Sequence, residues 1–368
     1  MHYCIFRTDR IGDLILTLPL AEAIKRADPA ARVTFCVQEY TRPLLSLDPN
    51  IDEIIAIGGR DLHGGVRRFA STLRERKIDC AVFAYPRPRL ALAAALAGIP
   101  MRIGSRYRWY SPLFTHRRAE HRRSGDSHEM EYNLRLLEEA GIAVPADLHP
   151  ALHIDAGRRA LALAALQRAG IDITAVNHAA ADSELPVITD SKAERQVGSN
   201  AATFAVLHPG SGGSARDWPA DRFAELAQGL LAEYPTLQLL VTGTATELPL
   251  METVAGGDAR IRLLREQLPL DILAAVLAEA RLFVSNSTGP LHIAAACGVP
   301  VLGFYPFGTA VNVRRWGPRA ERSAILSPAP DPACPACRAG DCPTHDDMHR
   351  IPVEEALAAA RGLLERSS

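Results

Sequence analysis

The stretch Leu282–Phe304, LFVSNSTGPLHIAAACGVPVLGF, decides the fold class. Its apolar run Leu282–Val284 is typical of a buried parallel strand, and the turn Ser285–Pro290 holds residues that begin helices. A helix of small residues follows over Leu291–Cys297, and a second strand begins at Val299. This order predicts a strand–helix–strand unit with both strands parallel in one sheet.

The turn within this unit is suited to hold an anion. Pro290 in the first helical turn costs no hydrogen bond, and a Ser or Thr before it can cap the backbone amides. Free N–H groups and the positive end of the helix dipole then point at one place, which suits a phosphate or a sugar nucleotide. An ordinary helix cap explains this segment equally well when it is taken alone. The candidate binding residues here are Ser287, Thr288, Gly289 and Pro290.

Composition limits the classes of protein to consider. The chain has 368 residues, is 48% hydrophobic and 23% charged, and carries a net charge of −1. This length favours two domains, and the neutral balance gives no case for nucleic-acid binding. No apolar run approaches the ~20 residues that cross a bilayer, and the N-terminus begins a strand without a signal sequence. We therefore expect a cytoplasmic protein.

Strands and helices alternate in both halves of the chain, which predicts an α/β fold with parallel sheets. We expect an N-terminal domain over 1–171, a linker or insertion over 172–200, and a C-terminal domain over 201–368. The last helix, Val353–Arg366, can pack on either domain, the N-terminal one included. In the first half, one helix containing Pro19 is expected over Leu14–Ala27.

Two further turns in the second half follow predicted strands. The loop His208–Pro219, HPGSGGSARDWP, has three glycines that let amides such as that of Ser211 approach an anion, and Arg216 can grip a phosphate with two hydrogen bonds. It matches neither a P-loop nor G-x-G-x-x-G, which disfavours nucleotide hydrolysis and an NAD-dependent oxidoreductase. A plain surface turn remains an alternative.

The third turn contains Thr242 and Gly243, and Glu247 comes shortly after them. The Glu247 carboxylate can accept hydrogen bonds from ribose hydroxyls, as acidic residues do at similar places in α/β folds. A carboxylate in a first helical turn, favoured by the dipole, explains Glu247 nearly as well.

Three motifs in order resemble the ADP-heptose:lipopolysaccharide heptosyltransferase family, glycosyltransferase family nine. They are RTDRIGDLILTLP at Arg7–Pro19, the loop at His208–Pro219, and STGPLHIAAA at Ser287–Ala296. The resemblance extends from Tyr3 to about Leu364. It implies a GT-B fold, in which two Rossmann-like domains face each other across a cleft. The first then binds the acceptor and the second binds the nucleotide sugar.

The resemblance also implies an inverting displacement at the anomeric carbon of the donor sugar. Asp13 matches the general base of the family, and Gly12 beside it allows the donor to approach closely. A helix N-cap is the alternative role for Asp13. The sequence contains no D-x-D triplet, so we expect a reaction that needs neither a metal ion nor a cofactor.

The donor and acceptor implied by the family are ADP-heptose and the anionic inner core of lipopolysaccharide. Ser287 stands where heptosyltransferases often have an acidic residue that holds the donor sugar. His292 can face the cleft or fill the helix interior. The arginine-rich run Arg102–Arg123 can bind acidic glycolipid and the membrane face, or be a solvated loop. The acceptor-binding candidates are Arg10, Arg60, Arg108 and His128.

The seven cysteines fall into two groups. Four lie in apolar contexts and are expected to be reduced core residues: Cys4, Cys36, Cys80 and Cys297. The other three, with His345, have a spacing that resembles part of a zinc site: Cys334, Cys337 and Cys342. His345, Asp346 or Asp347 would have to be the fourth ligand, and reduced or structural thiols are the favoured interpretation.

Two other functions remain open beside the glycosyltransferase. One is an epimerase-like nucleotide-sugar enzyme on the same fold, which would turn over the donor without an acceptor. The other is a non-catalytic protein that binds sugar nucleotides, which the presence of Asp13 argues against.

Overall fold

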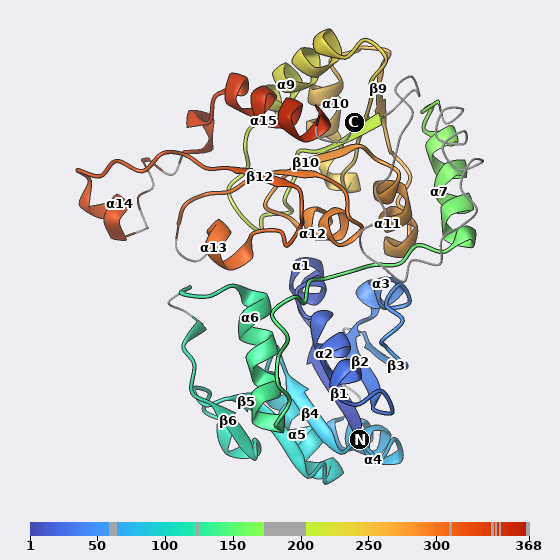
Figure 1. The fold of residues 1–368 in the computed structure, drawn as a ribbon, viewed down its shortest axis with the longest axis vertical. Coiled ribbons are helices and arrows are strands. Elements are labelled where there is room, and N and C mark those ends of the chain that lie inside the picture. Colours follow the sequence, from blue (N-terminus) through green and yellow to red (C-terminus); the bar gives the residue numbers. More distant parts are fainter. Residues whose placement is uncertain are drawn as a thin grey trace. The chain divides into compact units, whose positions relative to one another are not determined.

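The computed structural model describes residues 1–58, 65–122, 125–172, 204–308, 311–339, 342, 344–345 and 347–365. The chain forms two compact units, Met1–His153 and Ile154–Ser368, and each is built on a six-stranded sheet (Figure 1). In the parts of the chain that are described, no helix is long and apolar enough to cross a membrane.

The first sheet has the order β3-β2-β1-β4-β5-β6, and all its neighbouring strands are parallel. Its central core contains three aromatic rings, with Phe6 stacked on Phe83 at 4.4 Å and Phe83 against Phe114 at 5.1 Å. The strands are β1 (His2–Arg7), β2 (Arg32–Gln38), β3 (Glu53–Ile57), β4 (Cys80–Phe83), β5 (Met101–Ser105) and β6 (His116–Arg118). The helices are α1 (Ile11–Ile15), α2 (Pro19–Ala27), α3 (Arg42–Leu45), α4 (Val66–Glu75), α5 (Pro88–Ala97) and α6 (Glu129–Leu134).

The single helix expected over Leu14–Ala27 is wrong, because the structure has two. Helix α1 ends at Ile15, and α2 begins at Pro19. Proline lacks the N–H that a helix interior requires but fits the first position of a new helix. The buried Asn133 side chain donates to the carbonyl of Leu16 at this break, at 3.3 Å. The segment with Asp13 is therefore a separate short helix.

The second sheet has the order β12-β11-β10-β7-β8-β9 and is also parallel throughout. Its strands are β7 (Phe204–His208), β8 (Gln238–Val241), β9 (Ile261–Leu263), β10 (Leu282–Asn286), β11 (Val301–Phe304) and β12 (Ser323–Leu326). The helices after β7 are α9 (Ala220–Glu233), α10 (Leu248–Ala255), α11 (Leu270–Ala278), α12 (Gly289–Ala296), α13 (Val313–Trp316), α14 (Pro335–Ala339) and α15 (Val353–Glu365).

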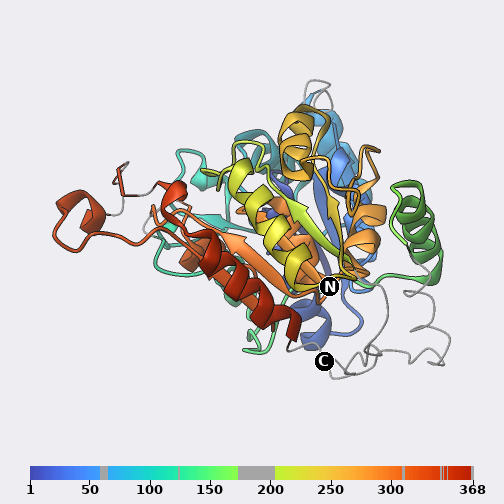
Figure 2. The same ribbon diagram turned by 90° about the horizontal axis from the view of Figure 1, so that it is seen from above.

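Two helices clarify the domain organisation. Helix α7 (Ala156–Arg168) packs on α11, and its Arg158 and Arg159 bond to Asp271 and Glu279, so it belongs to the second unit. The division after His153 thus differs from the boundary expected at residue 171. Helix α15 lies beside α9 in both views and packs on the second unit's core (Figures 1 and 2). The linker expected over 172–200 falls almost wholly outside the described residues.

The prediction of reduced core cysteines is confirmed, since Cys4, Cys36, Cys80 and Cys297 are buried and unbridged. Burial raises the pKa of the Cys80 thiol to about 12, so this group stays protonated at physiological pH.

Replacing Gly104 with Ala should destabilise the first unit. An added Cβ would lie 2.6 Å from the ring of Phe114, which is buried in the core. Overpacking of this kind costs about 1–3 kcal/mol of the free energy of unfolding, and thermal or urea denaturation measures it. Gly362→Ala in α15 is the control, because its added Cβ has no described atom within 4 Å apart from its chain neighbours and the backbone of its own helix. An equal stability of the two variants would contradict the tight contact at Gly104.

Candidate active site

A buried cluster of charged side chains lies where β1 ends. Arg7 is 3% exposed and donates to Asp9 from Nε at 2.8 Å and to Glu129 from Nη1 at 3.2 Å, while its Nη2 bonds to Asp13. Arg122 donates to the same Glu129 carboxylate at 2.7 Å. The carboxyl ends of parallel strands are where α/β folds place their ligand sites. The cluster therefore holds Asp13 at the edge of the sheet where α/β folds commonly bind ligands.

The cluster combines two guanidinium groups with three carboxyl groups. The surplus of negative charge favours the binding of a proton by one of the carboxyl groups. Burial raises the pKa of Asp9 to about 7; the Arg7 charge opposes this shift, and the Asp13 carboxylate adds to it. Burial alone would lower the pKa of Arg7, but Asp13, Asp9 and Glu129 together hold it above its ordinary value. Near neutral pH, Asp9 can thus carry a proton.

The side chain of Asp13 does not cap a helix. The N-cap of α1 is Arg10, and Asp13 lies in the first turn, so the alternative of an N-cap role for Asp13 is wrong. Its side chain is 16% exposed, while its partner Arg7 is almost wholly buried. Gly12 beside it is partly exposed, and Arg10 is exposed. Asp13 is thus held by the buried Arg7 guanidinium, while part of its own side chain remains exposed.

Three turns of the second unit lie side by side, because β10, β7 and β8 are neighbours in the sheet. They follow the carboxyl ends of these strands and contain Ser211, Thr242, Gly243, Ser287 and Thr288. The hydroxyl of Ser214 in the first turn donates to the carbonyl of Ser287 in the last, at 2.9 Å. The structure therefore brings together the predicted donor-binding turns. Arg216 lies exposed on the same loop.

Asn286 at the end of β10 joins both ends of the glycine loop. Its side chain accepts from the amide of Trp218 at 2.7 Å and donates to the carbonyls of Pro209 at 2.6 Å and Trp218 at 3.2 Å. Between these ends, Gly212 and Gly213 have φ of 58° and 75°, which glycine adopts without strain. The sequence analysis missed Asn286, although a polar residue closing a buried strand beside the Ser-Thr-Gly-Pro turn was an available signal.

Glu247 supports the glycine loop, residues 208–219, through a hydrogen bond. Its carboxylate accepts from the amide of Gly212 at 3.1 Å, and from the amide and hydroxyl of Thr244 at 2.8 Å each. Burial disfavours its ionisation, but these hydrogen bonds and the nearby His208 hold its pKa below the usual value. A Cβ on Gly210 would lie 2.0 Å from the Glu247 carboxylate. Glu247 lies in the first turn of a short 3-10 helix, which agrees with its alternative interpretation, and it also completes a capping box with Thr244.

The turn that begins α12 differs in detail from the expected cap. Thr288 occupies the N-cap position, but within the described part of the chain its side chain makes no capping hydrogen bond. Gly289 and Pro290 form the first helical turn, and Ser287 is partly exposed beside them. His292 is 5% exposed, which favours the helix-interior alternative for this residue.

The predicted acceptor residues lie in different surroundings. His128 is buried and caps α6, where its Nδ1 accepts from the amide of Met130 at 3.2 Å. Arg108 is exposed, and Arg60 lies outside the described residues. Within the arginine-rich run, Arg118 pairs with Glu138 at 2.7 Å.

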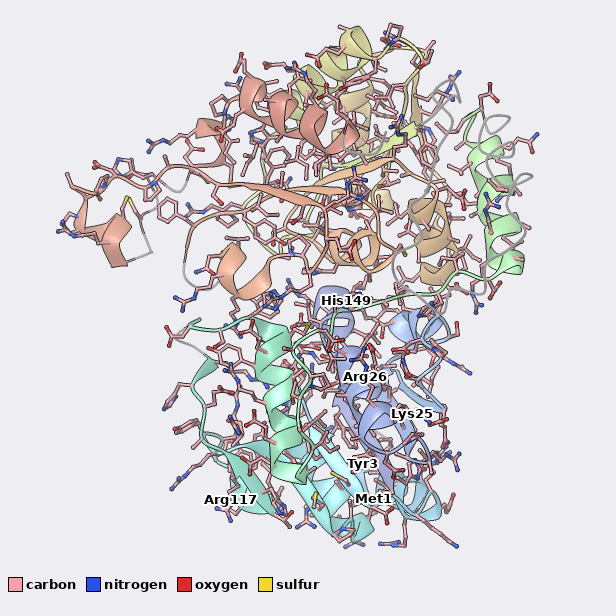
Figure 3. All side chains as sticks on the ribbon, viewed as in Figure 1. Met1, Tyr3, Lys25, Arg26, Arg117 and His149 are labelled. Atoms are coloured by element: carbon pink, nitrogen blue, oxygen red, sulfur yellow. The ribbon has the colours of Figure 1, made fainter. Side chains whose placement is uncertain are left out.

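The rest of this run divides in the same way. Arg102 donates to backbone carbonyls of Leu113 and Ile99, and Arg122 belongs to the buried cluster. Arg106 and Arg117 are exposed, the latter on the outer strand β6 (Figure 3). The run is therefore only in part a free basic surface.

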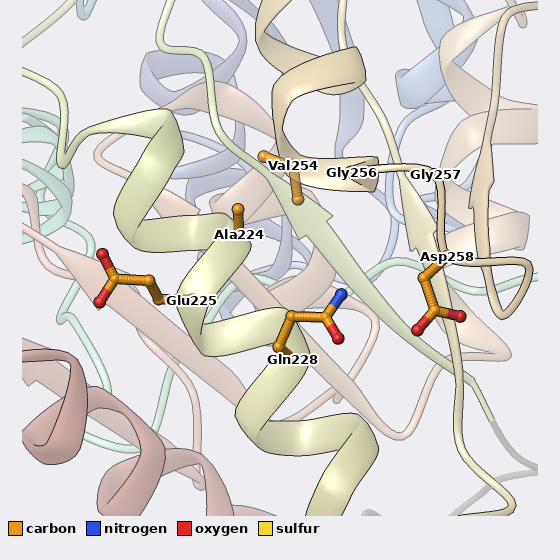
Figure 4. Close-up of a pocket in the computed structure, with 7 residues that line it drawn as sticks. All are labelled: Ala224, Glu225, Gln228, Val254, Gly256, Gly257 and Asp258. Carbon is orange, nitrogen blue, oxygen red and sulfur yellow. The ribbon is translucent and has the colours of Figure 1, made fainter.

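A hollow of about 760 Å³ lies between α9 and the end of α10 (Figure 4). Gly256, Gly257 and Asp258 line it and immediately precede β9, so it lies at the amino end of that strand. Ligand sites of parallel sheets occur at the opposite end, and none of the predicted site residues lines this hollow. We do not assign it to the candidate active site.

The two units, each a parallel sheet with helices and with candidate ligand-binding residues at its strand ends, have the architecture of the GT-B fold. Residues 66–341 match the sequence profile of glycosyltransferase family 9 (heptosyltransferase). The chain belongs to this family.

Its curated relatives are distant. Lipopolysaccharide heptosyltransferase 2 of Escherichia coli is 25% identical over 314 residues, 80% of each chain. A putative glycosyltransferase of Haemophilus influenzae is 25% identical over 319 residues, 85% of each. Among solved structures, E. coli ADP-heptose lipopolysaccharide heptosyltransferase II has a TM-score of 0.76 at 20% identity, covering 100% of this chain and 99% of that one. A family 9 protein of Veillonella parvula has 0.79 at 20%, covering 99% and 97%. These structures confirm the fold.

Asp9→Asn should change how stability depends on pH. An unfolded aspartate titrates near pH ~3.9, so folding takes up a proton at Asp9 between about pH 4 and pH 7. The parent therefore has this contribution at low pH and loses it as pH rises through about 7. The variant has no such group, and its free energy of unfolding should rise relative to the parent by about 2–4 kcal/mol across this range.

Urea denaturation at several pH values measures this difference. Asp221→Asn, an exposed residue in the first turn of α9, is the control and should run parallel to the parent. A constant difference between Asp9→Asn and the parent would show that Asp9 binds no proton on folding.

Proposed function

We propose that this protein is an inverting transferase that moves heptose or a related sugar from an ADP-sugar to the inner core of lipopolysaccharide, with Asp13 as general base. The observation that carries this proposal is the position of Asp13, a partly exposed carboxylate held by buried Arg7 at the end of β1. The curated relatives named lipopolysaccharide heptosyltransferase support the substrates.

In the proposed reaction, an acceptor hydroxyl attacks the anomeric carbon of the donor sugar while its proton passes to Asp13. A new glycosidic bond forms as the bond from that carbon to the diphosphate breaks, and ADP leaves with the bonding electrons. General-base catalysis of this kind contributes typically ~10²–10⁴-fold to a rate. Asp9 supports it by taking up a proton, so that two adjacent carboxylates need not both be ionised.

The second unit would bind the donor and stabilise the leaving group. Amides of the 209–214 loop and the start of α12 at Thr288–Gly289 offer N–H groups, and Arg216 offers a cation to the diphosphate. With these donors the reaction needs no metal at the phosphates, and transfer should proceed without added Mg²⁺. Thr242, Gly243 and Pro290 would contribute to the same donor site, and Glu247 would hold its loop. The buried His292 would support α12 from its interior.

The acceptor is inferred to be anionic and presented at the cytoplasmic face of the inner membrane. Arg10 lies exposed one helical turn from Asp13, and Arg108 is also exposed on the first unit. Both can pair with acidic sugars or phosphates of a lipopolysaccharide core. Arg60 stays a candidate from sequence, and His128 would act by fixing α6.

Asp13→Asn should lower the rate of transfer by about 10²–10⁴-fold while donor binding changes little, because the amide cannot accept the proton. A coupled assay of ADP release with acceptor present measures the rate, and calorimetry measures binding. The matched control is Asp9→Asn, which also alters a partner of Arg7 but leaves the base in place. If Asp13→Asn transfers sugar as fast as the parent, Asp13 is not the base.

Calorimetric titration with ADP, UDP, GDP and CMP, without added metal, should give selective binding of ADP. A preference for UDP or GDP would keep the glycosyltransferase class and overturn the donor. Hydrolysis of the donor that does not depend on acceptor would favour an epimerase-like enzyme. Absence of binding by all four nucleotides would remove the proposal.

A further inference from the structure

Three cysteines and one histidine meet in the segment between β12 and α15. The Nδ1 atom of His345 lies 3.2 Å from the Sγ of Cys337 and 3.3 Å from that of Cys342, and the Sγ atoms of Cys334 and Cys342 are 3.9 Å apart. All four ligand atoms lie within 4.8 Å of one another. The sequence left His345, Asp346 and Asp347 as alternatives for the fourth position. The structure brings His345 to it, and Asp346 lies outside the described residues.

The distance between the sulfurs of Cys334 and Cys342 fits a tetrahedral metal site. Zinc with Zn–S bonds of ~2.3 Å places its sulfur ligands ~3.8 Å apart, close to the 3.9 Å between Cys334 and Cys342. A disulfide between the same sulfurs would need ~2.05 Å, and the three thiols are unbridged. Three thiolates and one imidazole are also a common ligand set of structural zinc.

A carboxylate lies beside the outer nitrogen of the histidine. The Nε2 atom of His345 is 3.8 Å from the carboxylate of Asp331, while its Nδ1 points at the sulfurs. Histidines that bind metals generally direct their other nitrogen to a carboxylate or carbonyl, which fixes the tautomer. Asp347, by contrast, accepts from the amide of His349 at 3.0 Å and caps the short helix that follows.

We propose that Cys334, Cys337, Cys342 and His345 bind one Zn²⁺ as a closed structural site. Because the protein fills all four positions, no place remains for water or substrate, and the ion would not take part in sugar transfer. Its role follows from the local structure: α14 has five residues, too few to be stable as an isolated helix. A bound ion would connect Cys334 and Cys337, just before and within α14, to Cys342 and His345 after it.

The four candidate ligands are followed in the chain by residues that support the glycine loop. Met348 and Ile351 are buried in the core of the second unit, and the carbonyl of Ile351 accepts from Nε1 of Trp218 at 3.2 Å. Trp218 is the residue whose backbone Asn286 holds. Zinc would therefore fix the chain immediately before the segment that supports the end of the glycine loop.

The test is metal analysis of the full-length protein, purified under reducing conditions without chelator. We expect one zinc per chain in the parent, and loss of most of it in Cys334→Ser and in His345→Ala. His349→Ala, an exposed histidine four residues away, is the matched control and should keep its zinc. Replacement of the metal with Co²⁺ should give the visible absorption of a tetrahedral thiolate site in the parent and in His349→Ala alone.

The outcomes separate this proposal from its alternatives. A parent without metal and without the Co²⁺ spectrum overturns the site, as does a Cys334–Cys342 disulfide found by mass spectrometry of alkylated protein. Equal zinc in the parent and in both ligand variants places the ion elsewhere. Iron at the same stoichiometry overturns zinc as the metal. None of these measurements depends on transfer activity, so the metal site can be disproved while the glycosyltransferase proposal stands.

Discussion

One buried amide side chain fixes both ends of the glycine loop, residues 208–219, in the second unit. The side-chain oxygen of Asn286 accepts a hydrogen bond from the amide of Trp218. Its NH₂ group donates to the carbonyls of Pro209 and Trp218, at the two ends of the glycine loop. It is fully buried, so each partner would lose a hydrogen bond without water to replace it, at about 1–3 kcal/mol per group. The glycine loop is therefore restrained at both of its ends.

The two units meet different electrostatic requirements. In the first, charged groups surround Arg7, and proton uptake by Asp9 offsets the surplus of carboxylates. In the second, the strand-end turns offer neutral amides, and the ionised Glu247 is satisfied by Gly212 and Thr244. A base needs a carboxylate of controlled basicity, whereas a diphosphate needs donors that are already oriented. Each arrangement is suited to one of these tasks.

Sequence patterns predicted most of the regular structure, because strands and helices depend on local periodicity. The helices expected over Val353–Arg366 and Leu291–Cys297 are α15 (Val353–Glu365) and α12 (Gly289–Ala296) in the structure. The break at Pro19 was missed, since it depends partly on Asn133, which is distant in the chain.

The same limit applies to the candidate site. The motifs indicated Asp13 and the three turns, but not what holds them. Glu129 and Asn286 have partners 122 and 68 residues away, and nothing in the local pattern pairs them. The cysteine spacing left the fourth ligand open because short loops can bring several residues to one point. Such contacts become visible only when the fold is known.

The contact between Gly210 and Glu247 also limits how this sequence can diverge. A side chain at 210 would occupy the space of the 247 carboxylate, and a shorter residue at 247 would leave the Gly212 amide unsatisfied. Neither position can change first without loss, so we expect the two to be inherited as a pair. In related chains, a larger residue at 210 should occur together with a smaller one at 247, and the loop should then draw its support from a different neighbour.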